Sequence, residues 1–202
     1  MSTFKELGLS DDILRVLEEM EFVSPTDIQQ EAIPQLIGGD RDFIGLAQTG
    51  TGKTAAFGLP LLEMIDPQEN HTQALVLAPT RELGRQIAEQ LGKFSKYVKG
   101  LKVLPVYGGA AIMNQIKDLK KPTHIIIATP GRLIDLIKRK AVKLNQLKFL
   151  VLDEADEMVS MGFKEELDEI LSYTPETKQT WLFSATMAKE IKRIVSKYMD
   201  DP

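Results

Sequence analysis

A glycine-rich stretch in the first third of the chain has the residue types and spacing that bind nucleotide phosphates. It follows the apolar run at residues 43–47 and reads Ala47-Gln48-Thr49-Gly50-Thr51-Gly52-Lys53-Thr54. A strand, a glycine-rich turn and Gly-Lys-Thr at a helix start bring backbone N–H groups together around an anion. Lys53 would add positive charge for the β and γ phosphates, and the Thr54 hydroxyl could ligate Mg²⁺. The stretch predicts a nucleoside triphosphate site, although Ala47 stands where the usual pattern has Gly.

The same glycines also fit the dinucleotide-binding pattern G-x-G-x-x-A, from Gly50 to Ala55. That pattern needs an acidic residue at the end of the next strand to hold a ribose. The next apolar run, at residues 74–78, is followed by Pro79 and contains no acidic residue. A triphosphate loop is therefore the favoured interpretation.

A second group of chemically active residues is acidic and directly follows another apolar run. Asp153 stands where a phosphate-loop enzyme places the acid that holds Mg²⁺. Glu154 could orient an attacking water or accept its proton. Asp156 is placed to bond the hydroxyls of Ser184 and Thr186. The alternative is an exposed acidic helix start, which the helix dipole favours.

Six short apolar runs alternate with longer amphipathic stretches. Continuous apolar runs indicate strands buried on both faces, and the βαβ order indicates a parallel sheet with helices on both sides. Pro105 predicts an edge strand or a bulge, and Pro60 predicts a kink in the helix after the phosphate loop. Two earlier helices are expected to start at Ser10 and Thr26. The six runs are residues 43–47, 74–78, 103–107, 125–128, 149–152 and 180–183.

Every loop with unusual chemistry follows one of these runs. In an open parallel sheet, ligands bind outside the carboxyl ends of the strands, so these loops are expected to meet at one rim. Each loop alone could be an ordinary turn or helix cap, but six at one rim favour a functional site. They are the phosphate loop and residues 79–83, 108–109, 129–132, 153–156 and 184–186.

Composition narrows the class of protein. The 202 residues suit one domain, and the absence of cysteine excludes disulfides and thiolate metal sites. No apolar run approaches the ~18 residues of a membrane span, and the first residues lack a signal-peptide core. We therefore expect a cytoplasmic protein. A metal site at His71 or His124 is disfavoured because neither has a second His or Cys nearby.

Charge is segregated along the chain, although the formal net charge is −4. Residues 93–148 contain thirteen basic and two acidic residues, whereas residues 153–176 contain one basic and nine acidic residues. Such segregation can create a basic face that attracts phosphodiesters. The alternative is that these lysines only solvate exposed helix faces.

The sequence Asp-Glu-Ala-Asp at residues 153–156, downstream of this phosphate loop, resembles the signature of the DEAD-box family of RNA helicases. The resemblance covers nearly the whole chain in order and spacing. Residues 22–29 are similar to the family's adenine-reading Q motif, except that Glu21 stands where that motif begins with Gly. Phe4 matches an isolated upstream aromatic. The other similar stretches are motif I (47–54), motif Ia (79–83), the glycine doublet (108–109), motif Ib (129–132), motif II (153–156) and motif III (184–186).

The resemblance implies an α/β fold of the RecA-like type, a three-layer sandwich in which a mostly parallel twisted sheet carries helices on both faces. It also implies that residues 1–202 form one ATP-binding domain with a helical lead-in at residues 1–39. A second RecA-like domain, which carries the arginine finger, would lie outside this chain. The isolated domain is expected to be a monomer with little activity.

The implied ligands are ATP, Mg²⁺ and RNA. Gln29 would read the N6 and N7 edge of adenine, and Phe22 would pack against the base. RNA contacts through the phosphate backbone would be tolerant of sequence and weakened by salt. The implied catalytic residues are Lys53, Asp153, Glu154, Asp156, Ser184 and Thr186. The implied RNA contacts are Pro79, Thr80, Arg81, Gly108, Gly109, Thr129, Gly131 and Arg132.

Two other functions stay open on the sequence alone. A non-catalytic RNA-binding module would ignore nucleotide, which a titration with ATP would show. Half of a DNA-translocating ATPase would prefer DNA over RNA of the same sequence, because the 2′-hydroxyl is the main local difference.

Overall fold

The computed structural model describes residues 3–202, which form six strands, nine α-helices and one short 3-10 helix. The strands are β1 (Phe43–Leu46), β2 (Ala74–Leu77), β3 (Val103–Val106), β4 (Ile125–Ala128), β5 (Phe149–Leu152) and β6 (Gln179–Ser184). The helices before β3 are η1 (Phe4–Leu7), α1 (Asp11–Glu19), α2 (Asp27–Gly38), α3 (Lys53–Met64) and α4 (Arg81–Phe94). The later helices are α5 (Ile112–Leu119), α6 (Pro130–Lys138), α7 (Ala155–Ser160), α8 (Lys164–Ser172) and α9 (Lys189–Tyr198). Each of the six apolar runs became a strand, with bounds within about one residue of the prediction.

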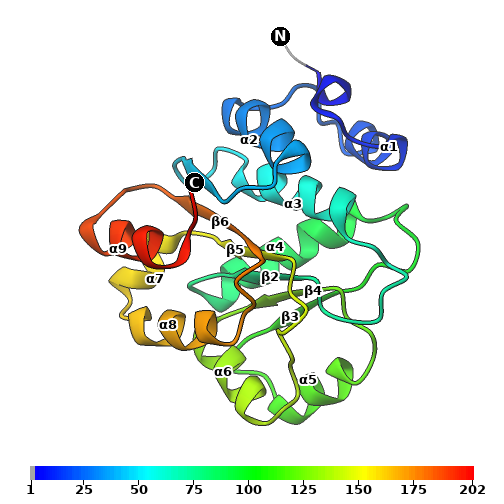
Figure 1. The fold of residues 1–202 in the computed structure, drawn as a ribbon. Coiled ribbons are helices and arrows are strands. Elements are labelled where there is room, and N and C mark those ends of the chain that lie inside the picture. Colours follow the sequence, from blue (N-terminus) through cyan, green and yellow to red (C-terminus); the bar gives the residue numbers. More distant parts are fainter. Residues whose placement is uncertain (1–2) are drawn as a thin grey trace.

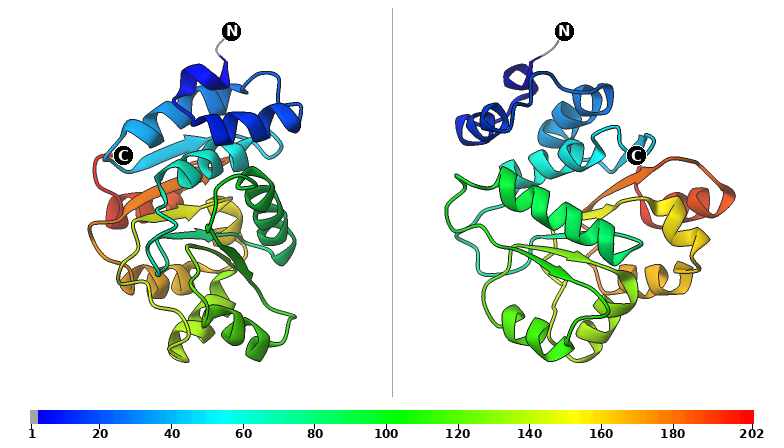
Figure 2. Two further views of the ribbon diagram at one scale, coloured as in Figure 1. Left: turned by 90° about the vertical axis from the view of Figure 1, so that its right-hand side faces the viewer. Right: turned by 180° about the vertical axis from the view of Figure 1, so that it is seen from behind.

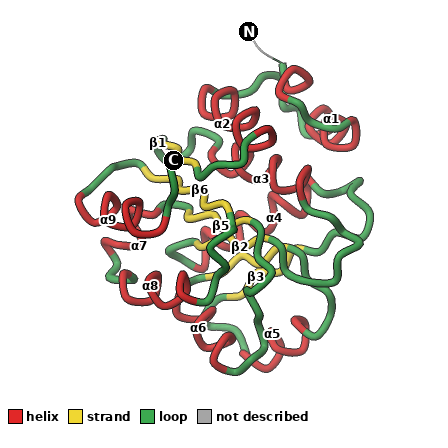
Figure 3. Tube along the Cα trace, in the orientation of Figure 1, coloured by secondary structure: helices red, strands yellow, loops and turns green. Residues whose placement is uncertain are grey.

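The strands form one sheet in the order β1-β6-β5-β2-β4-β3, and every pairing is parallel. The expectation of a parallel sheet is therefore confirmed. β3 lies at the edge of the sheet, where Pro105 removes one donor without breaking a ladder on both sides. The other edge is β1, which precedes the phosphate loop. Figure 3 shows the strands in the centre of the molecule with helices around them.

Side chains alternate along the central strands between two hydrophobic cores. On β2, Ala74 and Val76 point into the core shared with α3 and α4, while Leu75 and Leu77 point into the core shared with α6 to α9. Figure 2 shows α4 and α9 on opposite sides of the strands. The sheet is thus the middle layer of three, which confirms the expected sandwich.

The first helices pack outside α3 on the first of these faces (Figure 1). Thr26 begins α2 with a capping box that includes Gln29, as its place in the sequence predicts. Ser10 precedes α1, but its hydroxyl donates to Glu63 of α3 at 2.8 Å instead of capping the helix. α3 continues through Pro60 to Met64 as one helix.

Candidate nucleotide-binding site and nucleic-acid interface

The strand order sorts the six functional loops into two neighbouring groups. Because all strands are parallel, their carboxyl ends lie at one rim of the sheet, here called the carboxyl rim. The loops after β1, β6 and β5 are the phosphate loop, residues 184–186 and residues 153–156. The loops after β2, β4 and β3 carry the residues expected to touch RNA. One half of the rim therefore has phosphate-loop and acidic chemistry, and the other half has glycine and guanidinium chemistry.

The phosphate loop is a turn with two glycines in the left-handed region. Gly50 has a φ of +82° and Gly52 a φ of +91°. A Cβ added at Gly52 would lie 2.4 Å from the Gln29 amide nitrogen, so both conformation and space exclude a side chain there. The Thr51 hydroxyl donates to the Gln48 carbonyl at 2.7 Å, which closes the turn. α3 then starts at Lys53 and presents its free N–H groups to this loop.

Lys53 and Asp153 are the two buried charged residues beside the phosphate loop. Lys53 is 6% exposed and Asp153 is 2% exposed. Within residues 3–202, the buried Lys53 ammonium has no hydrogen-bond partner. Burial raises the pKa of Asp153 to about 6, although the positive charge of Lys53 acts to lower it. A buried ammonium without a partner is costly, and an anionic ligand would remove that cost.

Glu154 adopts an unusual backbone conformation for a residue with a side chain. Its φ of +51° and ψ of +51° lie in the left-handed region, and it caps the start of α7. Its N–H donates to the Asp153 carboxylate at 3.0 Å, and its own carboxylate accepts from the Thr49 hydroxyl at 3.2 Å. Strain of this kind concentrates at functional sites. The conformation places the Glu154 carboxylate against the phosphate loop.

Asp156 connects the acidic loop to the loop after β6. Its carboxylate accepts hydrogen bonds from both the N–H and the hydroxyl of Thr186, each at 3.0 Å. Burial acts to raise the pKa of Asp156, but hydrogen bonds, that from Thr186 foremost, hold it below its usual value. The predicted contact with Thr186 is confirmed. The Ser184 hydroxyl donates to the Thr186 carbonyl at 2.8 Å, and a hydrogen bond between Ser184 and Asp156 also acts to lower the pKa of that carboxyl.

Gln29 lies between α2 and the phosphate loop and is 3% exposed. Its amide oxygen accepts from the Thr26 N–H at 3.0 Å, and its amide nitrogen donates to the Gly52 carbonyl at 3.1 Å. An amide has one further donor and one further acceptor position, so reading of a base edge stays a prediction. Phe22 is half-buried and packs against Phe4 and Phe94, with ring centroids 6.2 and 5.8 Å apart.

Two adjoining cavities follow this half of the rim and share Thr49, Lys53 and Glu154. One, of about 450 Å³, also contacts Phe22, Gln29, Thr54 and Asp153. The other, of about 590 Å³, extends to Asp156 and Thr186. Both volumes are in the range of small-molecule sites. The residues predicted to bind nucleotide, metal and water are thus brought together, except that Gln48 and Thr51 serve the turn itself.

Sequence reasoning missed the contribution of α4 to the first cavity. Gln86, Glu89, Gln90 and Lys93 of α4 also line this cavity. Their spacing is that of one helix face, whereas Ile87, Leu91 and Phe94 form the buried face. Helical periodicity would have found this polar stripe, but nothing in the sequence shows that it faces the phosphate loop.

The other half of the rim begins with the loop after β2. Pro79 is buried, and the Thr80 hydroxyl caps α4 by accepting from the Leu83 N–H at 3.2 Å. Arg81 is exposed and lies against the glycine doublet of residues 108–109. A Cβ added at Gly109, whose φ is +83°, would lie 2.6 Å from an Arg81 nitrogen. Glycine at this position therefore allows the guanidinium to lie close to the β3–α5 loop.

Arg132 ties the loop after β4 to the residue that directly follows the glycine doublet. Its guanidinium donates to the Ala110 carbonyl at 3.0 Å and to the Gln115 side chain at 2.9 Å. Thr129 precedes α6 as its N-cap residue, and Gly131 is exposed with open space around its Cα. A guanidinium has more donors than these two bonds use, so Arg132 can also contact a phosphate. The residues expected to touch RNA therefore lie together.

The sequence left open whether the basic residues of the segment 93–148 form one face with the loops expected to touch RNA, and most of them lie elsewhere. The chain that follows a strand runs back through α3, α4, α5 or α6 from the carboxyl rim to the opposite rim, here called the amino rim, where the next strand starts. Lysines at the ends of α5 and α6 and before β5 consequently lie at the amino rim. They include Lys120, Lys121, Lys140, Lys143 and Lys148. At the carboxyl rim this segment contributes Arg132, and Lys93 lines the first cavity. Most of the lysines therefore do not form one face with the loops expected to touch RNA.

Comparison with known proteins identifies the family. Residues 26–194 match the model of the DEAD/DEAH box helicase family. The chain therefore belongs to the DEAD/DEAH box helicase family. It is 53% identical over 202 residues to the DEAD-box ATP-dependent RNA helicase CshA of Bacillus cereus, covering 100% of this chain and 38% of that protein. It is 52% identical over 201 residues to the RNA helicase CrhR of Synechocystis sp., covering 100% of this chain and 40% of that protein.

A solved structure agrees with the fold. The crystal structure of a DEAD box protein from the hyperthermophile Methanococcus jannaschii matches with a TM-score of 0.94 and 43% identity. The match covers 98% of this chain and 54% of that chain, which supports the RecA-like class of α/β fold. The chain spans about two fifths of the length of the curated relatives it matches. No helix within residues 3–202 is both long enough and apolar enough to cross a membrane.

Proposed function

We propose that this chain is the ATP-binding half of a DEAD-box RNA helicase. Joined to a second RecA-like domain, it would couple ATP binding and hydrolysis to sequence-tolerant RNA binding and local duplex unwinding. The observation that carries the proposal is the buried Lys53 ammonium, which has no hydrogen-bond partner within residues 3–202 and lies where the phosphate loop enters α3. A phosphate oxygen would supply the partner that this ammonium lacks.

The residues around Lys53 fit ATP with Mg²⁺. Thr54 and Asp153 would hold the metal, which neutralises phosphate charge when it is bound. Glu154 would orient the attacking water and accept its proton, since its carboxylate already contacts Thr49 of the phosphate loop. Gln29 and Phe22 would select adenine. Gln29 would use its remaining hydrogen-bond donor and acceptor positions, and Phe22 would pack the exposed part of its ring against the base.

Asp156, Ser184 and Thr186 would connect the nucleotide to the rest of the rim. The two hydrogen bonds from Thr186 to Asp156 join the loop after β6 to the loop that carries Glu154. A change at Glu154 on hydrolysis would therefore reach β6 through a single residue. We infer that this pair positions the acidic loop rather than touching ATP.

RNA would bind along the neighbouring half of the carboxyl rim. Thr80, Arg81, Gly109, Thr129, Gly131 and Arg132 offer guanidiniums, hydroxyls and backbone that a phosphate can approach closely. Such contacts fix the position of RNA but do not read its bases. Residues 1–202 would form one RecA-like domain, with residues 1–39 as a helical lead-in and a second domain as its partner. The relatives have room for that domain, since the match covers 38% of CshA.

Binding of ATP to the chain and its Lys53→Ala variant tests the proposal. Calorimetric titration in Mg²⁺ should show that Lys53→Ala weakens ATP binding by at least about tenfold, because a charge-assisted hydrogen bond to phosphate is lost. Lys189→Ala, which removes an exposed lysine of α9, is the control and should bind ATP normally. Equal affinity of the Lys53→Ala variant and the control would reject the nucleotide site.

A further inference from the structure

The amino rim carries a basic cavity that the proposed function does not use. The cavity, here called the lysine pocket, has a volume of about 380 Å³. The lysines that line it come from the end of α5 and from the segment between α6 and β5. Both segments lie at the amino rim, which is opposite the rim that carries the functional loops. The lining of the pocket includes His71 and four lysines, namely Lys120, Lys121, Lys140 and Lys143. No Asp or Glu within residues 3–202 lines it.

The four lysines are not neutralised by the protein. Across residues 3–202, none of Lys120, Lys121, Lys140 and Lys143 lies within 4.0 Å of a carboxylate. Two lysines nearby behave differently, because Lys138 pairs with Glu169 at 3.0 Å and Lys148 pairs with Glu69 at 2.8 Å. The pocket thus concentrates positive charge that an external anion can neutralise.

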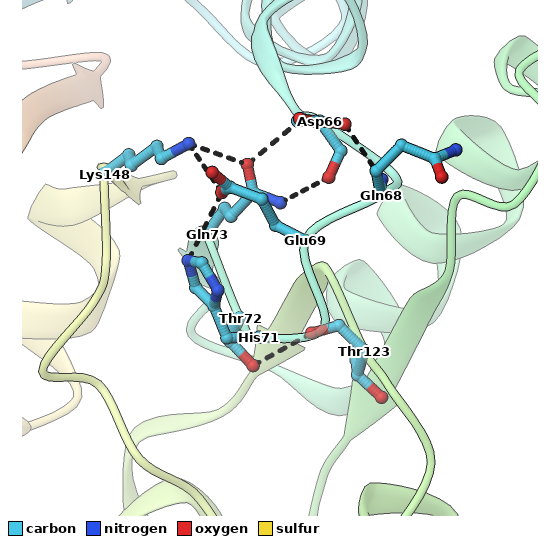
Figure 4. A network of polar contacts seen from close by, with 8 residues as sticks. All are labelled: Asp66, Gln68, Glu69, His71, Thr72, Gln73, Thr123 and Lys148. Carbon is cyan, nitrogen blue, oxygen red and sulfur yellow. Dashed lines mark hydrogen bonds and ion pairs between the residues drawn. The ribbon is translucent and has the colours of Figure 1, made fainter.

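A network of hydrogen bonds holds the wall of the pocket that includes His71 and Thr72 (Figure 4). The Gln73 amide is fully buried and bonds the backbone N–H and carbonyl of Asp66 at 3.1 and 2.7 Å. Thr72 donates to the Thr123 carbonyl at 3.0 Å. These bonds fix the segment before β2 against the start of β4, so this wall is preorganised.

The backbone conformation of Lys140 supports a binding role for its side chain. Its φ of +58° is left-handed, at a helix end where glycine is the usual residue. The turn is closed by hydrogen bonds from Lys140 to Ile137 at 2.8 Å and from Ala141 to Leu136 at 2.9 Å. A lysine held in a conformation that favours glycine is explained if its charge is used.

The residue types favour a phosphodiester ligand over a protein. Protein–protein interfaces are enriched in aromatic residues, Met and Arg and depleted in Lys. In the part of the chain that the structure describes, none of the enriched types lines the lysine pocket. Its other polar side chains are Asn, Thr and Gln, which bind phosphate and sugar. A four-residue strand spans only about 13 Å, so one RNA could reach both rims.

We propose that the lysine pocket is a second RNA-backbone site, which holds RNA flanking the stretch bound at the carboxyl rim. The proposal rests on the proposed function, since it assigns RNA as the polyanion. Contact at both rims would raise affinity for longer RNA, because the second contact is intramolecular. It would be independent of base sequence and sensitive to salt.

The test uses the 202-residue chain and a fluorescent single-stranded 30-nucleotide oligouridylate in anisotropy titrations at several salt concentrations. The variant replaces Lys120, Lys121, Lys140 and Lys143 by Gln. The control replaces four other lysines by Gln, namely Lys5, Lys164, Lys189 and Lys192, and so changes the net charge equally. The pocket variant should bind about tenfold or more weakly than the control, and its salt slope should be smaller by roughly 3 units, as expected for four phosphate contacts. A variant with Arg at all four pocket positions should retain binding.

Equal RNA affinity and equal salt slope for the pocket and control variants would overturn the proposal. It would also be overturned if polyglutamate at the same charge concentration, and not unlabelled RNA, competed at the pocket, because the site would then fit an acidic protein. Neither result tests the proposed ATP site, for which the Lys53→Ala variant is the separate test. Conversely, normal ATP binding by Lys53→Ala would reject the nucleotide site even if RNA bound the lysine pocket.

Discussion

The carboxyl group of Asp153 makes the stability of the ligand-free chain depend on pH. Burial raises its pKa from 3.8 to about 6, so the folded state binds a proton more tightly than the unfolded state. This group therefore stabilises the fold below about pH 4, and the contribution is lost as pH rises through about 6. A shift of this size corresponds to roughly 3 kcal/mol.

Asp153→Asn should consequently be more stable than the wild type at about pH 7.5, by up to about 3 kcal/mol, with the difference vanishing near pH 4. Urea unfolding in EDTA without nucleotide at both pH values measures this. Asp135→Asn, on an exposed position of α6, is the control and should be nearly neutral. If the Asp153→Asn advantage were the same at both pH values, the raised pKa would not be its cause.

Glu154 is the second residue at which function and stability oppose each other. Its left-handed backbone costs about 1 to 2 kcal/mol for a residue with a Cβ, while glycine loses about 0.5 to 1 kcal/mol of chain entropy. Glu154→Gly should therefore be more stable than Glu154→Ala by about 0.5 to 1 kcal/mol. Both variants remove the carboxylate, so the difference between their free energies of unfolding in urea measures the effect of the backbone conformation alone. An Ala variant as stable as the Gly variant would show that the backbone at this position is unstrained.

At the scale of elements, Gln29 links α2 to the phosphate loop and should control the order of that loop. Gln29→Ala loses the capping box and the bond to the Gly52 carbonyl, which should cost about 2 kcal/mol together. Hydrogen exchange at residues 48–54 should become faster. Gln30→Ala removes a comparable bond, to Pro25, on the same helix and should leave exchange there unchanged. Faster exchange in both variants would mean that α2 as a whole, and not Gln29, holds the loop.

The elements also show what sequence reasoning could and could not reach. Runs such as residues 125–128 predicted strands because a strand buried on both faces has no polar alternation, and all of its residues are buried here. The order of strands depends on packing across the whole sheet, so no local pattern showed that β6 lies between β1 and β5. The conformation of Glu154 was equally hidden, because that strain is imposed by its surroundings. Linear charge counting could not decide where the lysines of residues 93–148 lie, because it ignores that a helix between two parallel strands runs back to the amino rim.

At the scale of the whole molecule, the proposed nucleotide site lies at one half of the carboxyl rim. The cavity of about 590 Å³ that Lys53, Glu154 and Thr186 line forms part of this site. In the proposed function, a second RecA-like domain would close this cavity and would supply an arginine side chain that contacts the transferred phosphate. Such an arginine is worth about 10³ to 10⁵ in rate, or roughly 4 to 7 kcal/mol.

The 202-residue chain should therefore bind ATP weakly and show RNA-stimulated turnover at least about 10³-fold slower than a protein in which it is joined to its second domain. In the joined protein, Glu154→Gln should retain ATP while hydrolysis stops, because the amide keeps the shape of the carboxylate but cannot accept the proton. Phosphate release with and without RNA, measured in parallel with nucleotide retention, separates the two effects. Duplex unwinding by residues 1–202 alone would contradict the need for a second domain. Normal turnover by the joined Glu154→Gln protein would instead remove Glu154 from its role as the base while leaving the two-domain mechanism intact.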